Sequence, residues 1–234
     1  MRGLTPIVAG VATWALITGG LGPERDRTRA ALDAQELPPD RVLTAPVQHA
    51  PASREWDWLW LVEASVAPEP GALRELLAAA HGDDAAEDPV LLAGRVATPG
   101  GPLHPASLPV VEVLNADAVL AALDRRLLAL RVARPGSVLV HRKAFDAHGP
   151  PEPAPLGFFS WTARVLRSER GLLVPSSVAI RHAEAGPAPH AELTARLRLL
   201  RSEAFAPRER PWFAFQQATE AVRAVRRAGR AAQP

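Results

Sequence analysis

One carboxylate, Glu63, stands where an apolar run meets a turn, and Ser65 follows two residues later. The stretch from Trp56 to Leu77 has the pattern of a buried strand, a turn and a helix, so both side chains are expected at the strand's end. Hard divalent cations prefer oxygen ligands. One carboxylate and one hydroxyl make a poor metal site, and Glu63 can equally be a solvated acid at a strand end.

The elements that must position these residues alternate along the chain. Apolar runs predict strands at residues 6–17, 41–47, 56–62, 89–98, 136–141 and 172–182. Helical composition predicts helices at residues 24–35, 68–80, 115–130, 142–148 and 160–171. Alternating strands and helices predict an α/β fold with a mainly parallel sheet flanked by helices. Trp56, Trp58 and Trp60 alternate on one strand, and core packing is the simplest role for them.

The pattern changes after Pro189. We therefore predict one domain over residues 1–189 and an arginine-rich helical extension over residues 190–234. From Thr194 onward the chain holds nine Arg against three Glu, or +6, so the rest of the chain is about −4 and the basic surplus lies at this end. In the last predicted helix, four basic side chains lie largely off the apolar face: Arg223, Arg226, Arg227 and Arg230. This surface could bind the anionic membrane, dock onto a partner or remain solvated.

Composition excludes several classes of protein. The chain has 234 residues, of which 47% are hydrophobic, so it can bury a substantial core. It has no cysteine, which excludes disulfides and thiolate metal sites. The formal charge is only +2, and the sequence contains no recognised nucleic-acid-binding module, so nucleic acid is not an expected partner.

The first twenty residues combine Arg2 with an apolar run and could be taken for a signal peptide. Gly10, Thr13 and Trp14 interrupt that run, and a buried first strand explains it better. No segment approaches the ~20 apolar residues that a membrane span requires. We expect a cytoplasmic protein. The basic extension would also allow a peripheral position at the inner membrane face.

Together, these segments resemble the family 2 glycosyltransferases, which have the nucleotide-sugar-binding GT-A fold, and most of all an actinobacterial-type branch that builds cell-surface polysaccharide. The likeness covers roughly residues 5–228, with several motifs in the family's order. The stretches that carry it are "AALDAQELPPDRVL", "WDWLWLVEASVAPEPGALRELLAAA", "GSVLVHRKAFDAHG", "FFSWTARVLRSERGLLVPSSVAIRH" and "RPWFAFQQATEAVRAVRR".

The resemblance implies a set of site residues. In the family, aspartates at a strand end hold Mn or Mg, which neutralises the departing nucleoside diphosphate. Here that motif reads Glu63-Ala64-Ser65, and His182 matches the family's histidine after the last strand, so Glu63 and His182 are what remains of a metal site. Ser65 is at most a weak ligand, and His182 can instead be an ordinary loop histidine. Thr13 and Trp14 match the start of the family's first-strand motif, which implies donor binding with Glu63 and Ser65.

The sequence also departs from the family at its other acidic positions. The family's acids that recognise the acceptor and supply the general base are missing, because "FFSW" runs directly into "TARVLR". The simplest alignment deletes six residues, and a gap-free alignment places Gly157, Phe158 and Ser160 on those acids. The second strand carries no acid between Thr44 and Pro51. Other acids could be recruited as bases, although solvated or capping roles suit them better: Glu112, Asp117 and Asp124.

Two functions follow from this combination. The first is a family 2-like glycosyltransferase that moves a sugar from a nucleotide-diphospho-sugar to a glycan or lipid-linked acceptor and is impaired in metal-dependent catalysis. The second is a catalytically inactive relative that serves as a binding or scaffold subunit beside another glycosyltransferase. The resemblance favours the first, and the missing acids favour the second.

Overall fold

The computed structural model describes residues 10–20, 22–51, 54–82, 88–97, 110–111, 128–133, 136–153 and 157–182. Contacts between Cα atoms divide the chain into two compact units, Met1–Ala185 and Gly186–Pro234, and all described residues belong to the first. The predicted domain boundary at residue 189 and the basic helix with Arg223, Arg226, Arg227 and Arg230 lie outside the described residues, so both stay predictions.

The described residues form nine strands, four α-helices and one short 3₁₀ turn. In chain order these are β1 (Thr13–Thr18), α1 (Pro23–Asp33), β2 (Arg41–Thr44), η1 (Val47–His49), β3 (Trp58–Glu63), β4 (Val66–Pro68), α2 (Ala72–Ala80), β5 (Leu91–Ala97), β6 (Val110–Val111), β7 (Leu128–Val132), β8 (Ser137–His141), α4 (Arg142–His148), α5 (Gly157–Val165) and β9 (Gly171–Arg181).

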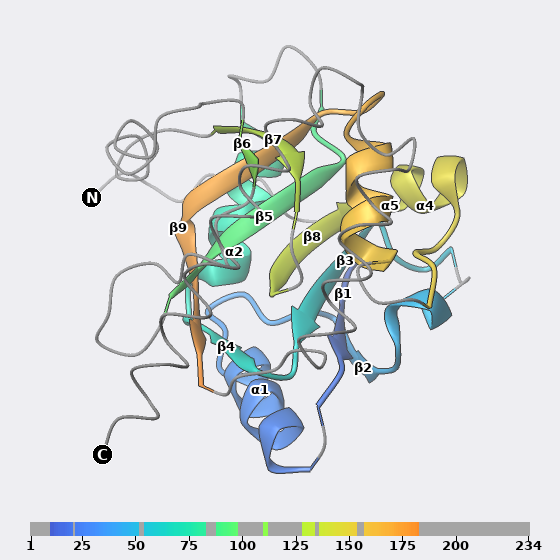
Figure 1. Cartoon of the computed structure of the whole chain (residues 1–234). Coiled ribbons are helices and arrows are strands. Elements are labelled where there is room, and N and C mark those ends of the chain that lie inside the picture. The colour runs from blue at the N-terminus through green and yellow to red at the C-terminus, as the bar shows by residue number, and fades with distance from the viewer. Residues whose placement is uncertain are drawn as a thin grey trace, which may run out of the picture. The chain divides into compact units, whose positions relative to one another are not determined.

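The strands make one sheet in the order β2-β1-β3-β8-β5-β9-β7-β6, and β4 pairs with β9 off this path (Figure 1). Pairing is parallel between β1 and both of its neighbours, and between β5 and β9, and is antiparallel elsewhere. The parallel contacts include the two longest, with six partner pairs for β1 and β3 and seven for β5 and β9. The predicted α/β fold is confirmed, with antiparallel pairing inserted between its parallel parts.

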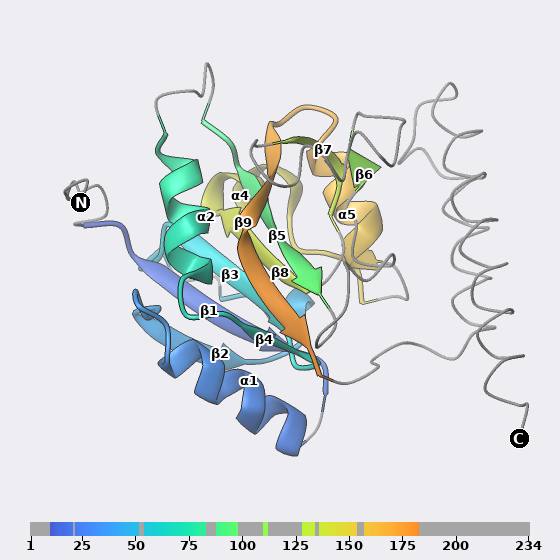
Figure 2. The ribbon, with the colours of Figure 1, turned by 90° about the vertical axis from the view of Figure 1, so that its left-hand side faces the viewer.

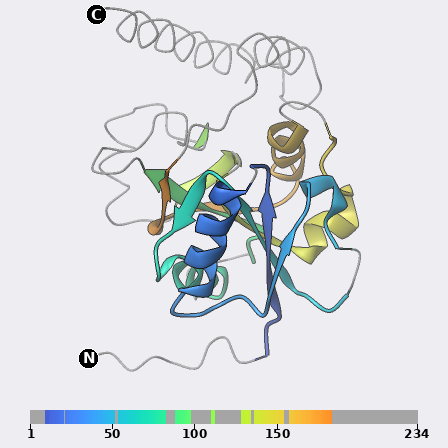
Figure 3. The ribbon, with the colours of Figure 1, turned by 90° about the horizontal axis from the view of Figure 1, so that it is seen from below.

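Buried side chains form two clusters, one on each face of the sheet. Successive residues of a strand point to opposite faces. On β3, Trp58 and Trp60 belong to the cluster under α1 and α2, whereas Leu59 and Leu61 belong to the cluster that also contains Trp161 of α5. Figure 2 shows α2 and α1 on one side of the sheet, and the view from below places α1 and the pair α4 and α5 on opposite sides of β1 (Figure 3).

The predicted core role of the three tryptophans is confirmed, because Trp56, Trp58 and Trp60 are all almost fully buried. The helix expected over residues 115–130 is wrong at its end: Leu128–Leu130 belong to β7, which pairs with β9. A short apolar run suits a strand as well as a helix, and the hydrogen bonds available beside β9 favour the strand. The rest of that expected helix lies outside the described residues. Residues 6–9 of the first expected strand also lie outside them.

Local sequence features explain where α1 begins and which face of α2 is buried. Pro23 begins α1, where a missing backbone N–H leaves no bond unmade, and Glu24 and Asp26 in the first turn suit the positive end of the helix. On α2 one face is buried, with Leu73, Leu76 and Leu77 in the core.

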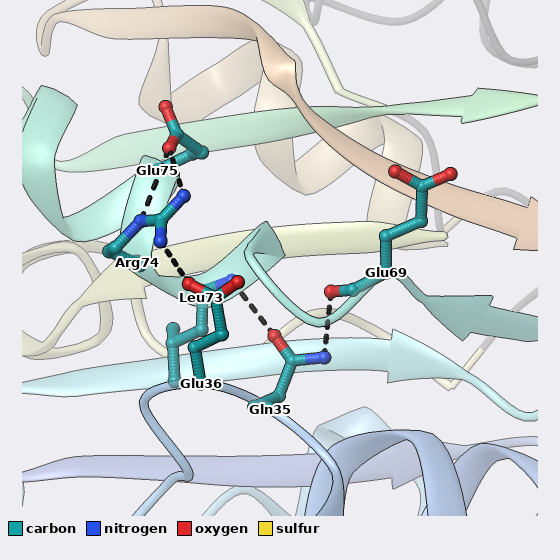
Figure 4. Close-up of polar contacts among 6 residues, drawn as sticks. All are labelled: Gln35, Glu36, Glu69, Leu73, Arg74 and Glu75. Carbon is teal, nitrogen blue, oxygen red and sulfur yellow. Dashed lines mark hydrogen bonds and ion pairs between the residues drawn. The ribbon is translucent and has the colours of Figure 1, made fainter.

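Gln35 joins the end of α1 to the start of α2. Its side-chain amide donates to the carbonyl oxygens of Ala31 at 3.0 Å and Glu69 at 2.8 Å, and its Oε1 accepts from the backbone N–H of Leu73 at 3.1 Å. Figure 4 shows the bonds to Glu69 and Leu73, beside the partly exposed ion pairs of Arg74 with Glu36 and Glu75. This buried amide holds in place the two helices that flank the turn after Glu63.

Replacing Gln35 with alanine is therefore expected to lower the free energy of unfolding by about 2–3 kcal/mol, because it leaves buried backbone groups unpaired. Urea unfolding followed by tryptophan fluorescence measures this change. The matched control is Arg74→Gln, which removes only partly exposed ion pairs and should cost less than about 1 kcal/mol. Equal losses in the two variants would contradict the role given to Gln35.

Candidate functional site

Glu63 ends β3 at the carboxyl edge of the parallel part of the sheet. Its Cα is the register partner of Thr18, the last residue of β1. The backbone around it is fixed on both sides: Glu63 donates its N–H to the carbonyl oxygen of Gly136 at 2.9 Å, and Ala64 donates to that of Thr18 at 2.9 Å. Ligands of α/β sheets bind outside the carboxyl ends of strands, so Glu63 lies at the expected edge.

A side chain of α1 holds the turn after Glu63 in place. The hydroxyl of Thr28, which is fully buried, lies 2.9 Å from the carbonyl oxygen of Ala64 and 2.8 Å from that of Val66 and donates its proton to this pair. The loop after β1 approaches from another side. Gly20 has a φ of 60°, and a Cβ on it would lie only 2.5 Å from the Cβ of Ala64. Glycine is required there, because only its backbone can come this close.

Arg181 reaches this turn from the last strand. The pairing of β4 with β9 is antiparallel and sets Val66 opposite Arg181, which brings the end of β9 alongside the turn. Arg181 donates from Nη1 to Oγ of Ser65 at 3.0 Å and from Nη2 to Oε2 of Glu63 at 3.1 Å. The side chains of Arg181 and Glu63 are only 15% and 19% exposed, so this ion pair is largely shielded from water.

His182 follows directly and is tied to the same turn. Its backbone N–H donates to the carbonyl oxygen of Ser65 at 2.9 Å. Its Nε2 is buried and has no hydrogen-bond partner among the described residues. Burial lowers the pKa of His182, the charge of Arg27 lowers it further, and Glu24 opposes the shift. The imidazole is therefore held in its neutral form at neutral pH.

The structure thus brings together three of the residues singled out from the sequence: Glu63, Ser65 and His182. Thr13 and Trp14 lie elsewhere, at the other end of β1, about 16 Å from Thr18 along the strand. Both are buried; the backbone N–H of Thr13 donates to Asp40, and Arg41 lies over the ring of Trp14. Their donor-binding role stays a prediction, and their position at the amino end of the strand weighs against it.

Arg181, Thr28 and the loop at Gly20 are the members of this site that sequence reasoning missed. Arg181 stands directly before His182 in "IRH", so the motif that pointed to the histidine passed over its neighbour. Nothing in the sequence signals the contact, since Arg181 and Glu63 are 118 residues apart.

The residues present do not fit a divalent cation. Glu63, the one carboxylate of the turn, is already bound by a guanidinium, and Ser65 is bound by the same group. In the part of the chain that the structure describes, no group of three or more His, Asp or Glu side chains is placed to hold a metal ion. A divalent cation at this turn would meet a resident positive charge instead of free carboxylates.

The helix α5 carries the positions that the gap-free alignment places on the family's acids. Gly157 and Phe158 are buried there, Ser160 is half-buried, and the helix contains no acid. The helix is fixed to the sheet by Thr162, whose buried hydroxyl accepts from the N–H of Ala133 at 3.1 Å. Glu112, Asp117 and Asp124 lie outside the described residues. Within those residues, no helix is long and apolar enough to cross a bilayer.

These features define a class of fold, that of the GT-A-like glycosyltransferases, and comparison with solved structures supports it. The chain resembles the crystal structure of GalNAc-T7 with UDP, GalNAc and Mn²⁺, with a TM-score of 0.52 and 11% identity over 83% of this chain. It spans 49% of that protein's chain. No family model matches the sequence, and no curated protein does either. At this identity the likeness shows the fold alone.

Proposed function

We propose that this protein is a family 2-like glycosyltransferase that binds a nucleotide-diphospho-sugar at the carboxyl ends of β1 and β3 and is impaired in metal-dependent sugar transfer. The fold supports the first part of the proposal, and GalNAc-T7, which shares it, is seen with UDP and GalNAc. The observation that carries the second part is the binding of both Glu63 and Ser65 by Arg181.

The acceptor in this proposal is a glycan or a lipid-linked sugar, as in the cell-surface polysaccharide branch that the sequence resembles. Work on a lipid-linked acceptor would suit a cytoplasmic protein held at the inner membrane face. The basic side chains Arg223, Arg226, Arg227 and Arg230 would supply the attraction to anionic lipid.

A second candidate is a catalytically inactive binding or scaffold subunit of a polysaccharide-synthesis system. The observation that favours it is the absence of any acid on α5, where the family's general base is expected. Acceptor activation needs a base within hydrogen-bond reach of the reacting hydroxyl. A scaffold would copurify with a partner transferase and would keep that interaction in a folded Glu63→Ala variant.

Calorimetric titration with a panel of uridine- and guanosine-diphosphate sugars, in Mn²⁺ and in EDTA, tests the proposal. We expect saturable binding of at least one donor, because the loop at Gly20 and the turn at Glu63 build an ordered edge of the sheet. A folded protein that gives no heat with any donor in either buffer would contradict the transferase proposal and favour the scaffold. A donor-binding protein that then releases no free sugar and transfers none to lipid-linked acceptors would be the inactive relative.

A further inference from the structure

We infer that the guanidinium of Arg181 takes the place of a divalent cation at the turn after β3 and is the counter-charge for the diphosphate of a nucleoside diphosphate. The inference rests on the proposed nucleotide-sugar binding and assigns to it a residue and a metal-independent mode. It starts from the position of the guanidinium, which bonds to both oxygen-bearing side chains of the turn, Glu63 and Ser65.

The guanidinium keeps donors for a ligand. Arginine presents five N–H groups in a rigid plane, and the bonds to Glu63 and Ser65 use two of them. Among the described residues, Nε of Arg181 has no hydrogen-bond partner although it is buried. A planar group with free N–H donors matches phosphate oxygens in pairs, which gives short charge-assisted bonds.

The formal charges of the site agree with this replacement. A divalent cation held by two carboxylates and a guanidinium held by one carboxylate both sum to zero. The turn keeps one carboxylate, Glu63, with Ala64 and Ser65 at the adjacent positions. A second carboxylate beside a single guanidinium would leave the site negative and repel a diphosphate. A turn with a single carboxylate therefore balances the single positive charge of Arg181.

The surroundings of the pair add an unpartnered ring nitrogen and positive charge. Nε2 of His182 is buried and unpartnered among the described residues, next to the same turn. Arg27 on α1 is near enough to act on the pKa of His182, and Arg25 donates from Nε to the carbonyl oxygen of Gly19 at 3.1 Å. Two arginines of α1 therefore lie near this site, Arg25 at the loop after β1 and Arg27 near His182.

A metal ion held by Oε2 of Glu63 would displace Arg181 from that oxygen. The displaced guanidinium would then be left without its carboxylate in a site that is largely shielded from water, which is strongly unfavourable. Unlike a lysine or a histidine, arginine cannot escape this penalty by losing its proton. The structure therefore favours metal-free over metal-bound occupancy of the turn.

The first test is titration of UDP and GDP in EDTA into the wild type, Arg181→Gln and Arg181→Lys, with Arg74→Gln as the matched control on α2. The wild type should bind one of the nucleotides without metal. Loss of charge-assisted bonds should weaken that binding about tenfold to hundredfold in Arg181→Gln, and less in Arg181→Lys, which keeps the charge. Arg74→Gln should bind as the wild type does. Circular dichroism confirms that each variant is folded.

The outcomes separate this inference from the proposed function. Nucleotide binding that requires Mn²⁺, or that is unchanged in a folded Arg181→Gln, overturns the inference and leaves the proposed function standing. No binding of any nucleotide or nucleotide sugar in either buffer overturns the proposed function and, with it, the phosphate role of Arg181.

A second test uses Mn²⁺ alone and does not depend on nucleotide binding. Electron paramagnetic resonance of free Mn²⁺ should show no saturable binding to the wild type at millimolar concentration. The double variant Arg181→Ala, Ser65→Asp removes the guanidinium and places a second carboxylate beside Glu63, so it should gain a Mn²⁺ site. Saturable Mn²⁺ binding to the wild type that the change Glu63→Gln abolishes would overturn the inference.

Discussion

Glu63→Ala is expected to lower the free energy of unfolding by about 2–4 kcal/mol, a large loss for one carboxylate at the end of a strand. The reason is the arginine left behind: Arg181 is only 15% exposed and would keep its charge without the carboxylate that lies 3.1 Å from its Nη2. Urea unfolding followed by tryptophan fluorescence measures the loss. A solvated acid at a strand end, the alternative that the sequence left open, would cost almost nothing when removed.

The control for this prediction is a double-mutant cycle. Arg181→Ala alone leaves Glu63 unpaired, whereas Glu63→Ala combined with Arg181→Ala removes both charges and should cost less than the sum of the single changes. Strictly additive losses would show that the two side chains are not coupled, which would contradict the ion pair between Glu63 and Arg181.

Trp60→Ala is expected to lower the free energy of unfolding by about 3–5 kcal/mol. The side chain of Trp60 is fully buried at the centre of β3, and its Nε1 donates to Oγ of Ser137 on β8 at 3.0 Å. The change opens a cavity between the sheet and α2 and leaves the hydroxyl of Ser137 without this partner. Urea unfolding monitored by circular dichroism gives the value, since one of the six tryptophans is lost as a fluorescent probe.

The graded control is Trp60→Phe, which keeps most of the apolar volume and removes the indole N–H. Its loss should be clearly smaller than that of Trp60→Ala. Arg164→Ala, at an exposed position of α5, should change stability by less than about 0.5 kcal/mol. If Trp60→Ala were as mild as Arg164→Ala, the core assigned to this face of the sheet would be wrong.

The two stability predictions differ in what they say about function. The stability loss of Trp60→Ala reports on the core packing that holds β3 in place. The loss of Glu63→Ala reports on the charge balance of the turn at the end of β3. An acidic motif that had decayed without replacement would leave an open polar turn, and removal of its last acid would be neutral. The contacts of Arg181 with Glu63 and Ser65 instead describe a turn whose charges are satisfied without a metal.

Local sequence patterns were enough to predict most elements of this fold. Near-continuous apolar runs predicted the strands that became β1, β3, β5, β8 and β9, because a strand covered on both faces must be apolar throughout. The periodic leucines of α2 predicted a helix with one buried face. The motif order also pointed to Glu63, Ser65 and His182, which the structure places at one turn.

How those elements meet depends on long-range strand pairing. The apolar residues before Val132 suited a helix as well as a strand, and pairing with β9 made them β7. The contact of Arg181 with Glu63 depends on the antiparallel register of β4 with β9, which sets Val66 opposite Arg181. β4 and β9 lie far apart in the chain and no hairpin turn joins them, so turn geometry cannot reveal their register. For this reason the sequence showed that acids were missing, and only the fold showed which side chain binds the one that remains.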